Sequence, residues 1–335
     1  MTALVTGASG FLGGTLANTL IDKGEKVRIL ARKTSKLDHL KDLPLEIAYG
    51  SLEDQTSLIE ALKGIDIVYH CAALSFDWGR WEEFYQANVT GVNNILAAAV
   101  NTGRIERFLH ISTSDVYGYP VKACDESYPI TNIGLFYNCS KGMGEKAVWD
   151  CYIETGLPIT IIRPVTIYGP RSKDIVGEIA GLLLKKQMVL INHGKSKAGL
   201  LYIDNAVEGI IEASISPNTI GQAYNLRDET DETWKQYVEA LADGLKVPYP
   251  RLHLPAGLAL ALARFLEGLY LTFRIQSRPL LTRHAVYICF RNQGYSIEKA
   301  QRDFGFKSKV SFEEGITRTL SWLKSEEGKS FMSRI

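Results

Sequence analysis

The chain has 335 residues, of which 46% are hydrophobic and 22% are charged, and its formal net charge is +1. This composition is typical of a globular protein with a large core and a smaller second unit. It excludes an overall positive electrostatic field that would attract nucleic acid. The five cysteines are odd in number and contain no Cys-x-x-Cys pair, which argues against a disulfide framework and a zinc site. We expect no metal and a reducing, cytoplasmic compartment, since no signal peptide precedes the first apolar run.

The chain opens with a strand, a glycine turn and a helix. Residues 3–6 are a short apolar run, and after Gly13 the apolar positions recur at helical spacing. A helix N-terminus carries unpaired N–H groups and partial positive charge, so it attracts phosphate. Gly7 allows the tight turn, Gly10 the close approach of a pyrophosphate and Gly13 the packing of helix on strand. With a second strand at 26–30, the pattern predicts a dinucleotide-binding half-domain.

The end of that second strand indicates which dinucleotide binds. NAD enzymes commonly place a carboxylate there for the ribose 2′-hydroxyl, whereas a nearby arginine suits a 2′-phosphate. This chain has Arg32 and Lys33 there, with Lys36 following, and no carboxylate. The cluster favours NADP over NAD, and the alternative is an ordinary solvated basic loop.

Strands and helices alternate through the first half of the chain. Further strands are expected at 45–49, 65–70, 107–111 and 158–162, with helices at 56–63, 81–102 and 137–155. This alternation predicts an α/β fold: a Rossmann, doubly wound parallel sheet with helices on both faces, followed by a smaller C-terminal substrate domain. The ligand crevice should lie beyond the carboxyl ends of the strands.

The candidate chemistry lies after the strand at 107–111 and at the start of the helix at 137–155. Tyr137 and Lys141 are four residues apart, so they share a helix face. A nearby ammonium would lower the pKa of the phenol, which could then exchange a proton with an alcohol or alkoxide. Thr113 would hold the reacting oxygen with its hydroxyl. The alternative is a surface helix that carries an unrelated tyrosine and lysine.

In these motifs the chain resembles the extended short-chain dehydrogenases/reductases over nearly its whole length. The shared segments also include residues 70–73, 88–91, 112–118, 163–170 and 202–206. The resemblance implies that Thr113, Tyr137 and Lys141 are catalytic, that Lys141 also holds the nicotinamide ribose, and that helices 81–102 and 137–155 pair in a homodimer.

The resemblance also implies a set of cofactor contacts and a division into domains. The cofactor-binding residues are expected to be Gly7, Ser9, Gly10, Phe11, Leu12, Gly13, Arg32, Lys36, Ser51, Leu52, Ala72, Ala73, Tyr137, Lys141 and Pro164. Residues 1–170 would form the NADP-binding domain, with 200–228 returning to it. Residues 171–199 and 229–335 would form the substrate domain.

The sequence departs from the family pattern at several positions. Where the family has Gly-Asp-Leu near the adenine, this chain has Ser51 in place of the aspartate. Sugar-modifying members carry an asparagine at the position of Thr166 and a diphosphate-binding arginine near 198–199, and both are absent. Dehydratases of the family tend to have a Thr-Asp-Glu triplet with two carboxylates, of which this chain keeps only one, Asp115. The C-terminal part instead resembles the 3-beta-hydroxysteroid dehydrogenase and dihydroflavonol reductase branch.

Residues 252–273 are almost uniformly apolar, and the uncharged run at 254–263 is too short to span a bilayer. The stretch is either a core helix of the substrate domain or a lid or peripheral membrane contact for lipid-like substrates. We expect an NADP-dependent oxidoreductase that interconverts a ketone and a secondary alcohol on an apolar small molecule. The alternatives are a nucleotide-sugar epimerase or dehydratase and a non-catalytic NADP sensor.

Overall fold

The computed structural model describes residues 1–333, and its centre is a parallel sheet of seven strands in the order β3-β2-β1-β4-β5-β6-β10. All neighbouring strands in it run parallel. The strands are β1 (Thr2–Thr6), β2 (Lys26–Ala31), β3 (Glu46–Tyr49), β4 (Ile67–His70), β5 (Arg107–Ile111), β6 (Ile159–Pro164) and β10 (Gln222–Leu226). The order in which the chain adds strands to the sheet reverses between β1 and β4. In a doubly wound sheet the ligand crevice lies at this point, outside the carboxyl ends of the strands.

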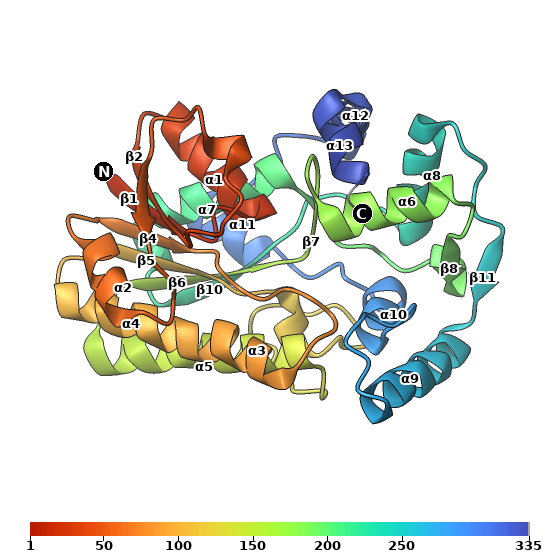
Figure 1. Cartoon of the computed structure of the whole chain (residues 1–335), viewed down its shortest axis with the longest axis horizontal. Helices are drawn as coiled ribbons and strands as arrows, with labels where there is room; N and C mark the ends of the chain where they lie inside the picture. The colour runs from red at the N-terminus through yellow and green to blue at the C-terminus, as the bar shows by residue number, and fades with distance from the viewer. Residues whose placement is uncertain (334–335) are drawn as a thin grey trace.

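Helices cover both faces of this sheet, as the alternating pattern predicts (Figure 1). One face carries α1 (Phe11–Asp22) and α7 (Ile203–Ile215), and the other carries α2 (Gln55–Leu62), α4 (Gly91–Thr102) and α5 (Phe136–Thr155). The predicted strands and helices are confirmed to within a few residues, except that the helix expected over 81–102 is interrupted. It consists of α3 (Trp81–Tyr85), a π-helical turn at Gln86–Thr90, and α4.

The second lobe is mostly helical and includes the two short strand pairs β7–β9 and β8–β11. Its elements are β7 (Thr166–Tyr168), α6 (Ile179–Leu184), β8 (Val189–Ile191), β9 (Leu200–Tyr202), α8 (Trp234–Leu245), β11 (Leu252–Leu254), α9 (Ala256–Thr272), α10 (Arg283–Phe290), α12 (Phe312–Lys324) and α13 (Glu326–Met332). Between α10 and α12, α11 (Glu298–Phe304) returns to pack against β10.

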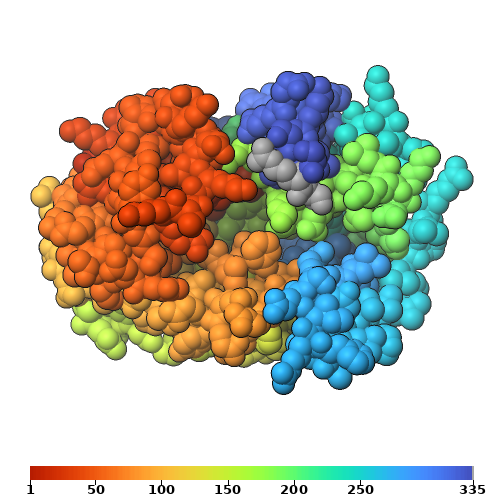
Figure 2. All heavy atoms as spheres, in the orientation of Figure 1, coloured from red at the N-terminus to blue at the C-terminus, as the bar shows by residue number. Residues whose placement is uncertain are grey.

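Two hydrophobic cores lie on opposite faces of the sheet. One lies between the sheet and α2, α4 and α5. The other runs continuously from α1 and α7 into the second lobe, where it includes Tyr237 and Leu241 of α8. This shared core fixes the second lobe against the sheet, and the surface is hollowed where the two meet (Figure 2). The five cysteines are free in this arrangement.

Candidate functional site

The glycine turn between β1 and α1 has the close-packed geometry of a phosphate-binding turn. Gly7 has a φ of +73°, and the Gly10 N–H donates to the Gly7 carbonyl at 2.9 Å. A Cβ at Gly13 would lie only 2.5 Å from that same carbonyl oxygen, so only glycine fits there. Gly10 caps α1 without a side-chain hydrogen bond, which leaves the helix N–H groups directed at the crevice. The turn therefore fits a pyrophosphate.

The predicted cofactor contacts gather along the carboxyl edge of the sheet. They lie in the turn after β1 (Gly7, Ser9, Gly10, Phe11, Leu12 and Gly13), after β2 (Arg32 and Lys36), after β3 (Ser51 and Leu52), after β4 (Ala72 and Ala73), at the end of β6 (Pro164) and at the start of α5 (Tyr137 and Lys141). The topology brings these separate segments to one edge because all the strands run parallel.

Two polar side chains, those of Thr6 and Asn88, fix the floor of this crevice. The Thr6 hydroxyl lies 2.9 Å from His70 Nδ1 and accepts a hydrogen bond from the Ala72 N–H at 3.1 Å, which ties the ends of β1 and β4 together. Asn88, in the π-helical turn, accepts from the Leu74 N–H and donates to the Leu74 carbonyl and to the Ser140 hydroxyl. Asn88 therefore connects the loop after β4 to α5. The sequence showed Asn88 only as part of a motif and gave no sign of this bridging contact.

The basic cluster after β2 is accessible. Arg32, Lys33 and Lys36 are exposed, and within residues 1–333 none of them forms an ion pair. Ser51 lies at the end of β3, where its hydroxyl accepts a hydrogen bond from the Glu53 N–H at 3.3 Å. These cations at the end of β2 are therefore available to an anionic group.

The predicted catalytic side chains meet where β5 ends and α5 begins. The Tyr137 hydroxyl lies near Thr113, which lowers its pKa and caps the short 3₁₀ turn Ser114–Tyr117. The Lys141 ammonium is buried and donates to the carbonyl of Ile111, the last residue of β5, at 2.7 Å. Burial lowers the pKa of Lys141 to about 8, partly opposed by Glu145. The structure therefore places the three residues at one strand end.

The electrostatics of Tyr137 differ from the sequence-based expectation. Burial raises its pKa well above the ordinary value, the Asp115 carboxylate raises it further, and the Thr113 hydrogen bond only partly opposes this. Lys141 is not among the groups that shift the pKa of Tyr137 in this arrangement, where its ammonium donates to the Ile111 carbonyl. Tyr137 is therefore a protonated phenol at neutral pH, able to donate a proton.

A histidine from the second lobe completes the surroundings of Tyr137. His284, near the start of α10, lies 2.9 Å through its Nε2 from Asp115 Oδ2, and its ring centroid is 5.8 Å from that of Tyr137. Burial lowers the pKa of His284, but the hydrogen bond and charge of Asp115 outweigh this and hold it above its ordinary value. The sequence could not reveal this pair, since 169 positions separate its members.

Acidic groups and aromatic rings surround these residues on the side of the second lobe. Arg278 forms a bidentate ion pair with Asp77 and lies 3.5 Å from Glu178. Asp174 is close enough to raise the pKa of Tyr137. The rings of Tyr119 and Tyr287 are stacked, with centroids 5.5 Å apart. The charges that raise the pKa of Tyr137 are therefore the carboxylates of Asp115 and Asp174, and the His284 ring lies against its ring.

Behind the catalytic side chains lies a buried ion pair. Arg163 on β6 binds Glu145 on α5, and the Ser112 hydroxyl donates to Glu145 at 2.6 Å. Arg163 also donates to the Tyr117 hydroxyl at 2.8 Å. Ser112 precedes Thr113, and Glu145 lies one helical turn after Lys141, so the pair braces both segments that carry the catalytic groups.

A parallel doubly wound sheet with a glycine turn at its switch point and a Thr/Tyr/Lys set at the neighbouring strand end defines an NAD(P)-dependent oxidoreductase of the extended short-chain type. The NAD dependent epimerase/dehydratase family matches residues 3–226. The chain belongs to this family, as the motifs predict.

Two similar proteins act on different substrates. A 4-hydroxy-2-methyl-3-oxo-4-farnesyl-3,4-dihydroquinoline-1-oxide ketoreductase of Stigmatella aurantiaca is 28% identical over 320 residues, which cover 94% of this chain and 95% of that protein. A decarboxylating sterol-4-alpha-carboxylate 3-dehydrogenase of Mus musculus is 28% identical over 327 residues, covering 94% and 89%. Ketoreductases and sterol dehydrogenases are thus among the relatives.

Among solved structures, the UDP-glucuronic acid 4-epimerase of Bacillus cereus in complex with NAD has a TM-score of 0.79. It is 22% identical, and the match covers 98% of this chain and 100% of that one. At this identity the likeness establishes the fold.

Proposed function

We propose that this protein is an NADP-dependent oxidoreductase that interconverts a ketone and a secondary alcohol on a largely apolar small molecule. The observation that carries the proposal is the environment of Tyr137: a protonated hydroxyl beside Thr113, with the His284 ring against its own ring and the carboxylates of Asp115 and Asp174 acting on it. Such a site offers a proton to a ketone oxygen and opposes the entry of an anionic ligand.

Each catalytic side chain has a role that its contacts allow. Tyr137 donates the proton to the carbonyl oxygen or takes it back from the alcohol, and Thr113 orients that oxygen through its hydroxyl. Lys141, whose ammonium donates to the Ile111 carbonyl at the strand end, lies on the same face of α5 one turn from Tyr137, and there it would hold the nicotinamide ribose. A bound nicotinamide cofactor supplies or accepts the hydride.

The choice of NADP rests on the loop after β2. Arg32, Lys33 and Lys36 are exposed and carry no ion pair within residues 1–333, and the last residue of β2 is Ala31, so no carboxylate stands at that strand end. A 2′-phosphate would give these cations a partner, whereas the 2′-hydroxyl of NAD would leave them without one.

The second lobe lacks the cations that a sugar diphosphate would need at the expected positions. Ala198 is fully buried, and Thr166 donates its N–H to the Gly199 carbonyl as part of the local backbone pairing. Of three nearby cations, Lys197 pairs with Asp231 at 2.6 Å and Arg171 lies 4.0 Å from Glu327, whereas Lys195 is exposed and forms no ion pair within residues 1–333. Burial of two phosphates against the acidic groups near Tyr137 would therefore be unfavourable.

The proposal is tested by comparing ligands on the NADP-bound protein. Hydrophobic ketones or alcohols should raise its melting temperature and support NADPH oxidation or NADP reduction, and UDP- or dTDP-sugars should do neither. Tyr137→Phe should lower turnover at least about 100-fold with cofactor affinity nearly unchanged, since it removes only the proton donor. Tyr85→Phe, an exposed tyrosine on α3, is the matched control. If a nucleotide sugar raises the melting temperature and the hydrophobic ligands do not, the protein is better assigned as a nucleotide-sugar epimerase.

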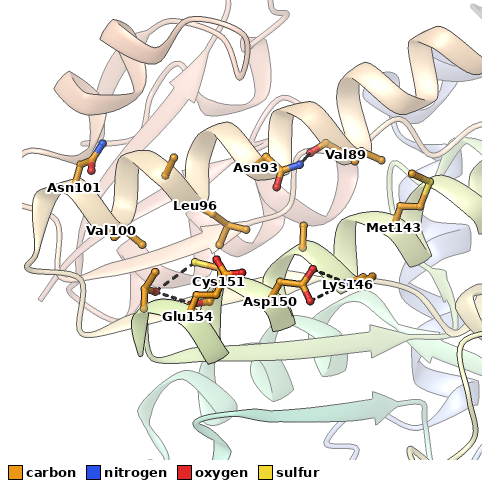
Figure 3. A pocket seen from close by; sticks show the side chains of 13 residues that line it. Val89, Asn93, Leu96, Val100, Asn101, Met143, Lys146, Asp150, Cys151 and Glu154 are labelled. Atoms are coloured by element: carbon orange, nitrogen blue, oxygen red, sulfur yellow. Dashed lines mark hydrogen bonds and ion pairs between the residues drawn. The ribbon is translucent and has the colours of Figure 1, made fainter.

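We also propose a homodimer through α4 and α5. A shallow hollow of about 600 Å³ lies between these helices, and Figure 3 shows that its lining side chains come from facing turns of the two. Small or apolar residues such as Ala97, Val100 and Ala147 are part of the lining. None of Thr113, Tyr137 or Lys141 lines it, so pairing there would leave the catalytic side chains open. Sedimentation of the intact chain measures the assembly directly.

A further inference from the structure

The helix α9 in the second lobe is turned with its small residues inward and its large apolar residues outward. Its buried positions are Ala256, Ala259, Ala263 and Glu267, which recur every three to four residues and so form one face. Exposed on the opposite side and just beyond it are Leu258, Leu262, Phe265, Leu269, Leu271 and Phe273. A helix at a water-exposed surface normally buries its large apolar residues, so α9 shows the reverse arrangement.

This orientation is fixed by specific contacts. The alanine face packs on Ile191 of β8 and Val286 of α10. The buried Glu267 carboxylate accepts hydrogen bonds from the Arg283 N–H at 2.6 Å and the Arg283 Nε at 2.5 Å. Rotating α9 to hide its leucines would break this ion pair and leave a buried charge unpaired. The structure therefore puts the alanine face of α9 in a small core and leaves most of its large apolar residues outside that core.

The charges around the exposed face are basic. Residues 251–283 contain five arginines and a single acidic residue, the buried Glu267. Arg278 and Arg283 are paired with carboxylates, but Arg251, Arg264 and Arg274 are exposed and form no ion pair within residues 1–333. The whole chain carries only +1, so the basic charge is concentrated at this edge. An apolar helix face flanked by free arginines is complementary to a bilayer with anionic headgroups.

We propose that α9 and the segment following it, to Leu280, form a peripheral membrane-binding face that inserts its leucine and phenylalanine side chains among anionic lipids. No helix within residues 1–333 is long and apolar enough to cross a bilayer, so α9 would lie along the surface. In Figure 2 this part of the chain forms the lower right edge of the molecule, away from the sheet.

The opposite, buried side of α9 adjoins the element that reaches the candidate active site. Glu267 ties α9 to α10, and α10 carries His284, whose ring contacts that of Tyr137. Arg278 and Thr282 both bind Asp77 in the loop after β4. Membrane contact there would let a lipid-like ketone pass from the bilayer to Tyr137 without crossing water. This last step rests on the proposed function, whereas the binding of lipid does not.

The test is flotation of the full-length protein with vesicles, without cofactor or substrate. We expect it to float with vesicles of phosphatidylcholine and phosphatidylglycerol, less with phosphatidylcholine alone, and less at high salt. The double variant Leu262→Ser/Phe265→Ser should reduce partitioning at least about tenfold, the factor expected from losing even part of the burial of these side chains. Arg264→Gln and Arg274→Gln should each reduce it about fivefold on anionic vesicles only.

The matched control is Ile215→Ser at the end of α7, because Ile215 and Phe265 are equally exposed, at 62%. Tyr137→Phe should float like the wild type, which separates lipid binding from the proposed reaction. The inference is overturned if the wild type floats with neither vesicle or if the α9 variants float like Ile215→Ser. It is equally overturned if the α9 variants float like the wild type but sediment differently in vesicle-free solution. That result would show that the face binds a second copy of the chain.

Discussion

Replacing Glu145 with glutamine should destabilise the fold strongly, because it leaves the Arg163 guanidinium buried without a counter-charge. The side chains of Arg163 and Glu145 are only 5% and 0% exposed, and Glu145 also accepts a hydrogen bond from the Ser112 hydroxyl. Removing one member of such a pair costs about 3–5 kcal/mol of unfolding free energy. For a chain of this length, that loss lowers the melting temperature by about 4–7 °C.

The assay is thermal and urea unfolding of wild type and variants, with Glu60→Gln as the matched control. Glu60 lies on α2 and pairs with Lys63 at 2.5 Å, but both side chains are largely exposed. The loss of this exposed pair should cost no more than about 1 kcal/mol. An apolar replacement of both buried partners, Glu145→Leu/Arg163→Met, should recover part of the stability lost in Glu145→Gln. If Glu145→Gln is no more destabilising than Glu60→Gln, the buried pair does not brace the site as described.

Two further predictions concern the cofactor and pH. Wild type should bind NADPH more tightly than NADH. Arg32→Ala or Lys36→Ala should each reduce that preference about tenfold in fluorescence titrations, since each removes a charge-assisted hydrogen bond. Equal affinities of the wild type for NADPH and NADH would refute the assignment of NADP. Because the pKa of His284 is raised on folding, its protonation adds stability that is fully present below its unfolded pKa and is lost as pH rises through the folded value. The melting temperature of wild type should therefore exceed that of His284→Gln more at about pH 6 than at about pH 9, and a pH-independent difference would contradict the Asp115 pairing.

The sequence alone determined the fold class and the candidate residues on the sheet. Alternating apolar strands and amphipathic helices specify a parallel doubly wound sheet, and parallel strands must bring their carboxyl ends to one edge. The turn at Gly7–Gly13 and the positions of Thr113, Tyr137 and Lys141 could therefore be predicted, because short-range patterns encode them. The helix over 81–102 was predicted as one element, and its π-helical turn was missed because the contacts of Asn88 with Leu74 and Ser140 come from tertiary packing.

Only the tertiary structure decided what surrounds Tyr137 and which way α9 faces. The pairing of Asp115 with His284 depends on how the second lobe docks on the sheet through their shared core, and no local pattern records that docking. The raised pKa of Tyr137 has the same origin, since burial and the Asp115 charge outweigh the effect expected from sequence neighbours. For α9, apolar residues occur on every side of the helix, so periodicity could not select the buried face. The Glu267–Arg283 ion pair and the close fit of the alanines selected it.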